Sequence, residues 1–165
     1  MQNYLPAVLV SLVVIAIVIR NQLRTIPVTP VRTYLMPLIF CLYGIGLVIF
    51  QDHGRFIDPA HAVVSAALLV VELAVAVALG YGRAVTVIVW RDAKGALMRR
   101  GTGWTAAAWI GSILVRLGFA GGAYLMGIHS AIGLVMVFLA VTLLAQNMFI
   151  VRRGRSAAIA ATVQA

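Results

Sequence analysis

The sequence predicts an all-α membrane protein, built as a five-transmembrane-helix bundle. Hydrophobic residues make up 63% of the 165 residues and charged residues only 10%, whereas soluble domains are about 45 to 50% apolar and about 25% charged. The apolar residues gather in five long runs, and about 20 residues of helix are enough to cross the hydrocarbon core of a bilayer. Little of the chain remains for a soluble domain. We therefore expect one transmembrane domain, 1–153, followed by a flexible tail, 154–165.

The distribution of the thirteen basic residues predicts how the bundle is oriented. Eleven of them fall in three segments that five successive spans would place on the same side: Arg20, Arg24, Arg32, Arg83, Arg91, Lys94, Arg99, Arg100, Arg152, Arg153 and Arg155. The positive-inside rule makes this side cytoplasmic, so we expect the N-terminus outside and the C-terminus inside a bacterial plasma membrane. Basic side chains there attract anionic lipids by about 1 kcal/mol each. The net charge of +9 therefore implies a lipid surface and no nucleic acid.

The first two predicted helices are apolar and serve mainly for packing. The first, at about 6–19, has no polar side chain except Ser11. Pro27 and Pro30 follow in a loop, where they fix φ and prevent a continuous helix into the next span. The second helix, at about 34–50, has one narrow face of Pro37, Cys41, Gly44 and Val48. We expect another helix to approach closely along this face.

The third predicted helix, 60–81, carries Glu72 in a segment otherwise built of Ala, Val and Leu. At a rise of 1.5 Å per residue, Glu72 lies about 18 Å from the first residue and thus near the bilayer midplane. An ionisable group is costly there unless it faces the bundle interior with a partner. The helical spacing of His61, Ser65, Leu68 and Glu72 places these residues on one face. The sequence therefore predicts a polar stripe that runs from the outer mouth of the helix to its middle.

A change in composition marks the segment between the third and fourth helices. We expect Gly80 and Gly82 to end the third helix. Residues 86–90 are β-branched and aromatic, 91–95 have turn chemistry, and 96–100 continue with more charge. This pattern predicts a short cytoplasmic β-hairpin or interfacial loop with a role at the membrane surface.

The fourth predicted helix, 104–124, supplies a partner for Glu72. Small side chains recur in steps of four around Arg116, so another helix can approach it. Counted from the outer ends of the two helices, Arg116 and Glu72 differ in depth by about 6 Å, a gap that the long stem of an arginine can cover. We predict a Glu72–Arg116 ion pair. Gly118 and Gly122 form a G-x-x-x-G pair on another face, which favours helix contact within the fold or between subunits.

The fifth predicted helix, 131–150, ends in a short polar series. Thr142, Gln146 and Asn147 lie near its cytoplasmic end, where the amide side chains can bond to a neighbouring helix or sit at the interface. The single cysteine, Cys41, excludes an intramolecular disulfide and a Cys-x-x-Cys redox pair.

Two interpretations of Glu72 and Arg116 remain open. As a structural pair they fix which helices pack together, although a buried ion pair gains little net stability. As a functional pair they form a site open to the outer side, in which Arg116 holds an anionic or carbonyl group and Glu72 is the acceptor or acid. The other candidate ligand-binding residues are His61, Ser65, Ser112 and Tyr124.

The leading functional hypothesis is a small membrane binding or accessory protein. Its partners would be the lipid bilayer, a second copy or a membrane complex, and a small amphipathic or apolar ligand. The alternative is an intramembrane enzyme of isomerase or cyclase type, with Glu72 as its general acid or base. The sequence leaves the substrate and any cofactor open.

The three histidines suggest a second alternative, a haem- or metal-binding membrane protein. His53, His61 and His129 all map to the outer side, and histidines on different helices can hold a haem or a metal ion. No His-x-x-x-His or Glu-x-x-His pair is present. We therefore assign no residue as a metal ligand.

One stretch of sequence resembles a known family. It contains Val89-Trp90-Arg91-Asp92, Gly95 and Arg100-Gly101-Thr102, followed by Trp109 and Arg116-Leu117-Gly118. Together with the short apolar spans and the basic loop with prolines at 20–32, this stretch is similar to the CcdC-like family of small bacterial membrane proteins. The resemblance implies the membrane architecture. The family name is associated with cytochrome c biogenesis, but this chain has no cysteine pair to carry thiol transfer.

Overall fold

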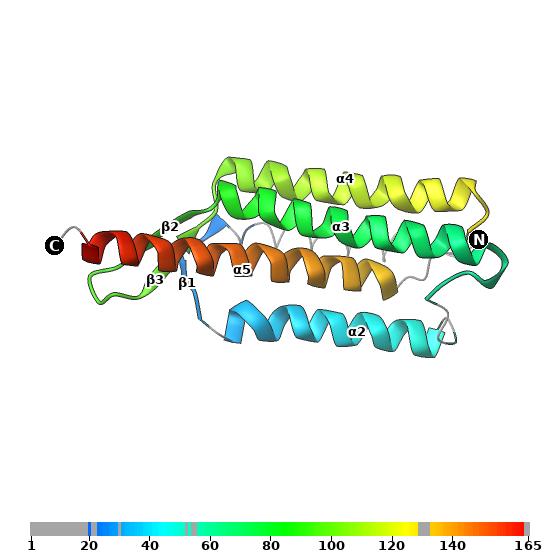
Figure 1. Cartoon of the computed structure of the whole chain (residues 1–165), viewed down its shortest axis with the longest axis horizontal. Coiled ribbons are helices and arrows are strands. Elements are labelled where there is room, and N and C mark those ends of the chain that lie inside the picture. Colours follow the sequence, from blue (N-terminus) through cyan, green and yellow to red (C-terminus); the bar gives the residue numbers. More distant parts are fainter. Residues whose placement is uncertain are drawn as a thin grey trace.

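Four long helices lie side by side in the computed structural model, which describes residues 20, 23–29, 31–51, 53, 56–128 and 133–163 (Figure 1). They are α2 (Met36–Gln51), α3 (Ala62–Thr86), α4 (Gly103–Leu125) and α5 (Gly133–Val163). Each belongs to a segment long and apolar enough to cross a membrane, which is the pattern of a multi-pass membrane protein. The helix predicted at 6–19 lies outside the described residues.

Helix α5 is the centre of the packing. It lies between α2 and α3, and α4 covers the other side of α3 (Figure 1). The predicted narrow face of α2 is confirmed, since Pro37, Gly44 and Val48 are buried. A Cβ atom on Gly44 would lie 2.7 Å from the carbonyl oxygen of Gly133 in α5. Only glycine allows the two backbones to approach this closely.

Helix α3 continues to Thr86, so the prediction that Gly80 and Gly82 end it is wrong. A Cβ atom on Gly80 would lie 2.5 Å from the carbonyl oxygen of Thr142, so this glycine serves contact with α5. The contact with α5 offsets the roughly 1 kcal/mol that a glycine costs inside a helix. The extra turn places Arg83 inside the bundle, whereas the sequence pattern placed it in a loop.

A small antiparallel sheet lies at one end of the bundle, which we call the sheet end (Figure 1). The predicted hairpin is present as β2 (Ile88–Arg91) and β3 (Leu97–Arg100), paired from Ile88↔Arg100 to Arg91↔Leu97. Its turn forms because the Asp92 carboxylate accepts hydrogen bonds from the backbone N–H groups of Lys94 and Ala96. A third strand, β1 (Ile26–Pro27), pairs with β3 in the order β1-β3-β2.

Two short segments complete the described fold. A π-helical stretch, Val31–Leu35, precedes α2, and a 3₁₀ turn, Pro59–His61, precedes α3. Helix α5 runs to Val163 instead of ending near residue 150. Its extension lies beside the sheet, where Gly154 is buried against Leu97.

Candidate functional site

Glu72 and Arg116 meet inside the bundle. Arg116 Nη1 donates a hydrogen bond of 2.8 Å to Glu72 Oε1. The Arg116 side chain is 9% exposed and the Glu72 side chain 5% exposed. The guanidinium carbon of Arg116 lies 5.8 Å from the centroid of the Phe138 ring of α5. The pair therefore joins α3 to α4 and is shielded by α5.

The inward face of each helix explains this meeting. The buried residues of α3 recur at helical spacing: Ser65, Glu72, Ala76, Gly80, Arg83 and Ala84. Those of α4 do the same: Thr105, Trp109, Ser112, Arg116 and Ala123. Because residues three, four and seven apart share a helix face, both charged groups point to the same interior.

A small cavity reaches Glu72 from the end of the bundle opposite the sheet. It encloses about 20 Å³ and is lined by polar Asp58, Ser65 and Glu72. The rest of the wall is apolar: Phe56, Leu68, Leu69, Ala123, Ile128 and Leu134. A volume of this size holds about one water molecule. The hydroxyl of Ser65 is buried there without a hydrogen-bond partner, so the cavity offers a single oxygen atom a donor or an acceptor.

Neither His61 nor Ser112 lines this cavity. His61 is exposed at the surface, with Nδ1 3.6 Å from a carboxylate oxygen of Asp58, which does line the cavity. Ser112 is buried one turn from Arg116, but its hydroxyl donates to the carbonyl oxygen of Ala108 in the same helix. Of the four predicted ligand residues, Ser65 alone lines the cavity.

Tyr124 does not line this cavity, and its side chain is 82% exposed. Each step of four residues turns a helix by about 40° past a full turn. Two such steps from Arg116 carry Tyr124 about 80° away, whereas a step of seven residues returns to within about 20°. The buried position at this level is accordingly Ala123.

The described residues contain no group of three or more His, Cys, Asp or Glu side chains that could hold a metal ion. His53 is exposed, with a positive φ of 51°, and His61 pairs with Asp58. His129 lies outside the described residues.

A second buried polar group lies nearer the sheet end, and the sequence pattern missed it. Arg83 is 1% exposed, and its guanidinium carbon lies 4.0 Å from the ring centroid of Trp109 in α4. Among the described residues, none of its three guanidinium nitrogens has a hydrogen-bond partner, and neither do Trp109 Nε1 or the amide of Gln146 in α5. Arg83 continues the face of Glu72, Ala76 and Gly80. If the helical spacing of Glu72 and Ala76 is continued beyond Gly80, it places Arg83 inside the bundle.

Threonine hydroxyls join α3 to α4 beside Arg83. Thr86 Oγ1 donates to the carbonyl oxygen of Arg83 across 2.8 Å, and it lies 3.0 Å from Thr105 Oγ1 of α4. Thr102 caps the start of α4 through a capping box with Thr105. These contacts satisfy the backbone at the helix ends and leave the Arg83 side chain unpaired.

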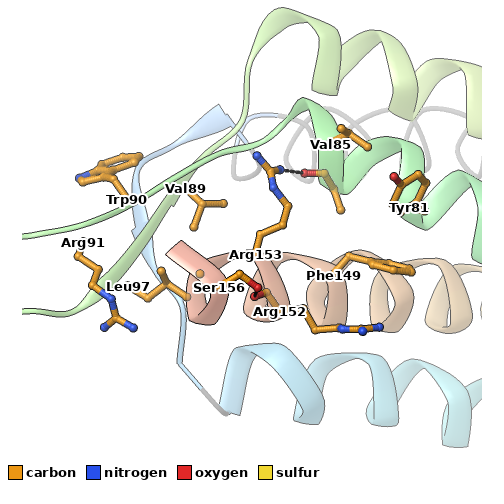
Figure 2. A pocket seen from close by; sticks show the side chains of 12 residues that line it. Tyr81, Val85, Val89, Trp90, Arg91, Leu97, Phe149, Arg152, Arg153 and Ser156 are labelled. Atoms are coloured by element: carbon orange, nitrogen blue, oxygen red, sulfur yellow. Dashed lines mark hydrogen bonds between the residues drawn. The ribbon is translucent and has the colours of Figure 1, made fainter. Parts of the chain in front are cut away.

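A surface groove of about 710 Å³ lies between the sheet and the ends of α3 and α5 (Figure 2). Arg153 crosses it and donates to the carbonyl oxygens of Ala84 and Val87, at 2.6 Å and 3.2 Å. Arg91 donates to the carbonyl oxygen of Gly95, and Arg152 is exposed. Apart from Ser156, the rest of the lining is mostly apolar, so the groove combines an apolar wall with cationic groups.

Comparisons of the chain with models of protein families, with curated proteins and with solved structures find no match.

Proposed function

We propose that this chain is a small membrane binding or accessory protein in which Glu72 and Arg116 form the floor of a polar site. The observation that carries the proposal is the cavity lined by Asp58, Ser65 and Glu72. It connects a charged pair within the bundle to the end where α3 begins. A pair that served packing alone would need no such opening.

The size of the cavity limits what it can hold. Pockets that enclose a whole small molecule occupy about 300 to 1,000 Å³, whereas this cavity encloses about 20 Å³. It admits one water or the carbonyl or hydroxyl oxygen at the tip of a larger molecule. The body of that molecule would lie against the apolar wall around Phe56 and Leu68, which suits an amphipathic ligand.

The basic residues support an orientation with the sheet end in the cytoplasm of a bacterial cell. The cavity then opens outward, and the groove with Arg91 and Arg152 faces the inner leaflet, where anionic lipids gather. Membership in the CcdC-like family, assembly into an oligomer and docking to a membrane complex are further parts of this proposal.

Native mass spectrometry of the full chain in a mild detergent tests the binding site. We expect wild-type protein to retain a small molecule that Ser65→Ala loses, because the Ser65 hydroxyl lines the cavity without a partner. Ser112→Ala is the matched control, since that hydroxyl is already bonded within its own helix. Wild-type protein that retains no small molecule, or equal retention by both variants, would refute the binding site.

A further inference from the structure

Arg83 is a buried cation whose charge no described side chain balances. The sequence has four acidic residues. Glu72 pairs with Arg116, and at eleven residues along α3 it lies about 16 Å from Arg83. Asp58 contacts His61 and caps the 3₁₀ turn before α3, and Asp92 closes the hairpin turn. The fourth, Asp52, lies outside the described residues.

Two other buried side chains also have polar atoms without partners among the described residues. They are Trp109, whose Nε1 is a donor, and Gln146, whose amide has a donor in Nε2 and an acceptor in Oε1. Gln146 lies at nearly the same depth in the bundle as Arg83. A Cβ atom on Gly80 would lie 3.1 Å from the backbone nitrogen of Gln146, and Gly80 is about one helical turn from Arg83. The next residue, Asn147, differs: its amide accepts from Arg99 and donates to the carbonyl oxygen of Thr33. Asn147 is thus used for packing, and Gln146 is not.

We propose that Arg83, Trp109 and Gln146 form a second site, which binds a phosphate-class oxyanion. A buried guanidinium without a counter-charge is costly, and an oxyanion would supply both the charge and the acceptors that this group lacks. Arginine binds phosphate oxygens in pairs through its planar fork. The three side chains come from α3, α4 and α5, and donors on three helices would suit the tetrahedral oxygens of phosphate better than a planar carboxylate.

Access to this site depends on the Trp109 side chain. The Glu72–Arg116 pair and the contact between Thr86 and Thr105 join α3 to α4 on either side of Arg83, so the two helices stay together. The Trp109 ring covers the Arg83 guanidinium, and rotation of this side chain would uncover it. Arg83 lies about 4.5 Å along the axis from the last residue of α3. In a membrane-spanning bundle this depth approaches the headgroup level, where the phosphate of a lipid or a free phosphate can enter.

Trp109 provides the reporter for the test. In the full chain carrying Trp90→Phe and Trp104→Phe, both at exposed positions, Trp109 is the remaining tryptophan. Its fluorescence is measured during titration with sodium phosphate, with short-chain phosphatidic acid and with sodium acetate, each against sodium chloride at the same ionic strength. We expect a saturable change with a phosphate compound. A response to phosphatidic acid alone identifies a lipid phosphate, and a response to both compounds identifies phosphate as the shared ligand.

Variants of Arg83 decide whether the response belongs to this site. Arg83→Gln should weaken binding about tenfold or more, as expected for losing a charge-assisted hydrogen bond, and the exposed Arg100→Gln should leave it unchanged. If Arg83→Gln does not fold, Gln146→Leu replaces it and should also weaken binding. The proposal is overturned if no phosphate compound gives a saturable change, if acetate alone does, or if the folded variant binds as wild type does.

Discussion

The ion pair between Glu72 and Arg116 can be tested by a double-mutant cycle of Glu72→Gln, Arg116→Gln and both changes together. The 2.8 Å contact and the low exposure of both side chains place the pair among buried ion pairs, where removing one partner costs about 3 to 5 kcal/mol. An exposed pair would contribute only about 0 to 1 kcal/mol. We expect each single change to lower the free energy of unfolding by about 3 kcal/mol or more, because each leaves one buried charge without its partner.

The double variant should recover most of this loss. Two glutamine side chains carry no charge and can bond to each other across the same gap, so the desolvation penalty disappears together with the attraction. The expected coupling energy is therefore at least about 3 kcal/mol, at the upper end of values for residues in direct contact.

Reversible unfolding in a fixed detergent, followed by circular dichroism, measures the three variants against wild type. Asn147→Leu provides a comparison, since it breaks buried hydrogen bonds elsewhere on α5 and should be additive with Glu72→Gln. Single variants within about 1 kcal/mol of wild type, or losses that simply add in the double variant, would show that Glu72 and Arg116 do not depend on each other as a buried ion pair.

Two further predictions concern packing and orientation. Gly80→Ala should destabilise the fold by about 1 to 3 kcal/mol, because its methyl group would lie 2.5 Å from a carbonyl oxygen of α5. Gly82→Ala is the control, since this position has open space around it, and it should be neutral or stabilising in the same unfolding measurement. The orientation is tested by cysteine labelling in a Cys41→Ser background. A membrane-impermeant maleimide should label Phe56→Cys in intact cells and Arg100→Cys only after permeabilisation, because the two exposed positions lie at opposite ends of the bundle. The reverse labelling pattern would mean that the proposed topology is inverted.

Several features of this protein follow from sequence alone because they are local. Apolar length is a property of each segment, so four spans could be placed without knowing how they pack. The hairpin follows from β-branched residues around Asp92 and Gly95. The Glu72–Arg116 contact could be predicted because a charged residue within a bilayer needs a partner at a similar depth, and depth can be counted along each helix from the sequence.

The remaining features depend on contacts between distant segments. Gly80 has the same local character whether it ends a helix or lets α5 approach, and only the position of Thr142 decides between the two. That decision extends α3 and buries Arg83. The two-residue strand β1 exists only because β3 offers it an edge. Sequence thus determined which segments are helical and where the charges lie in depth, whereas tertiary packing decided which charges are buried and which remain unpaired, because burial depends on the neighbouring helices.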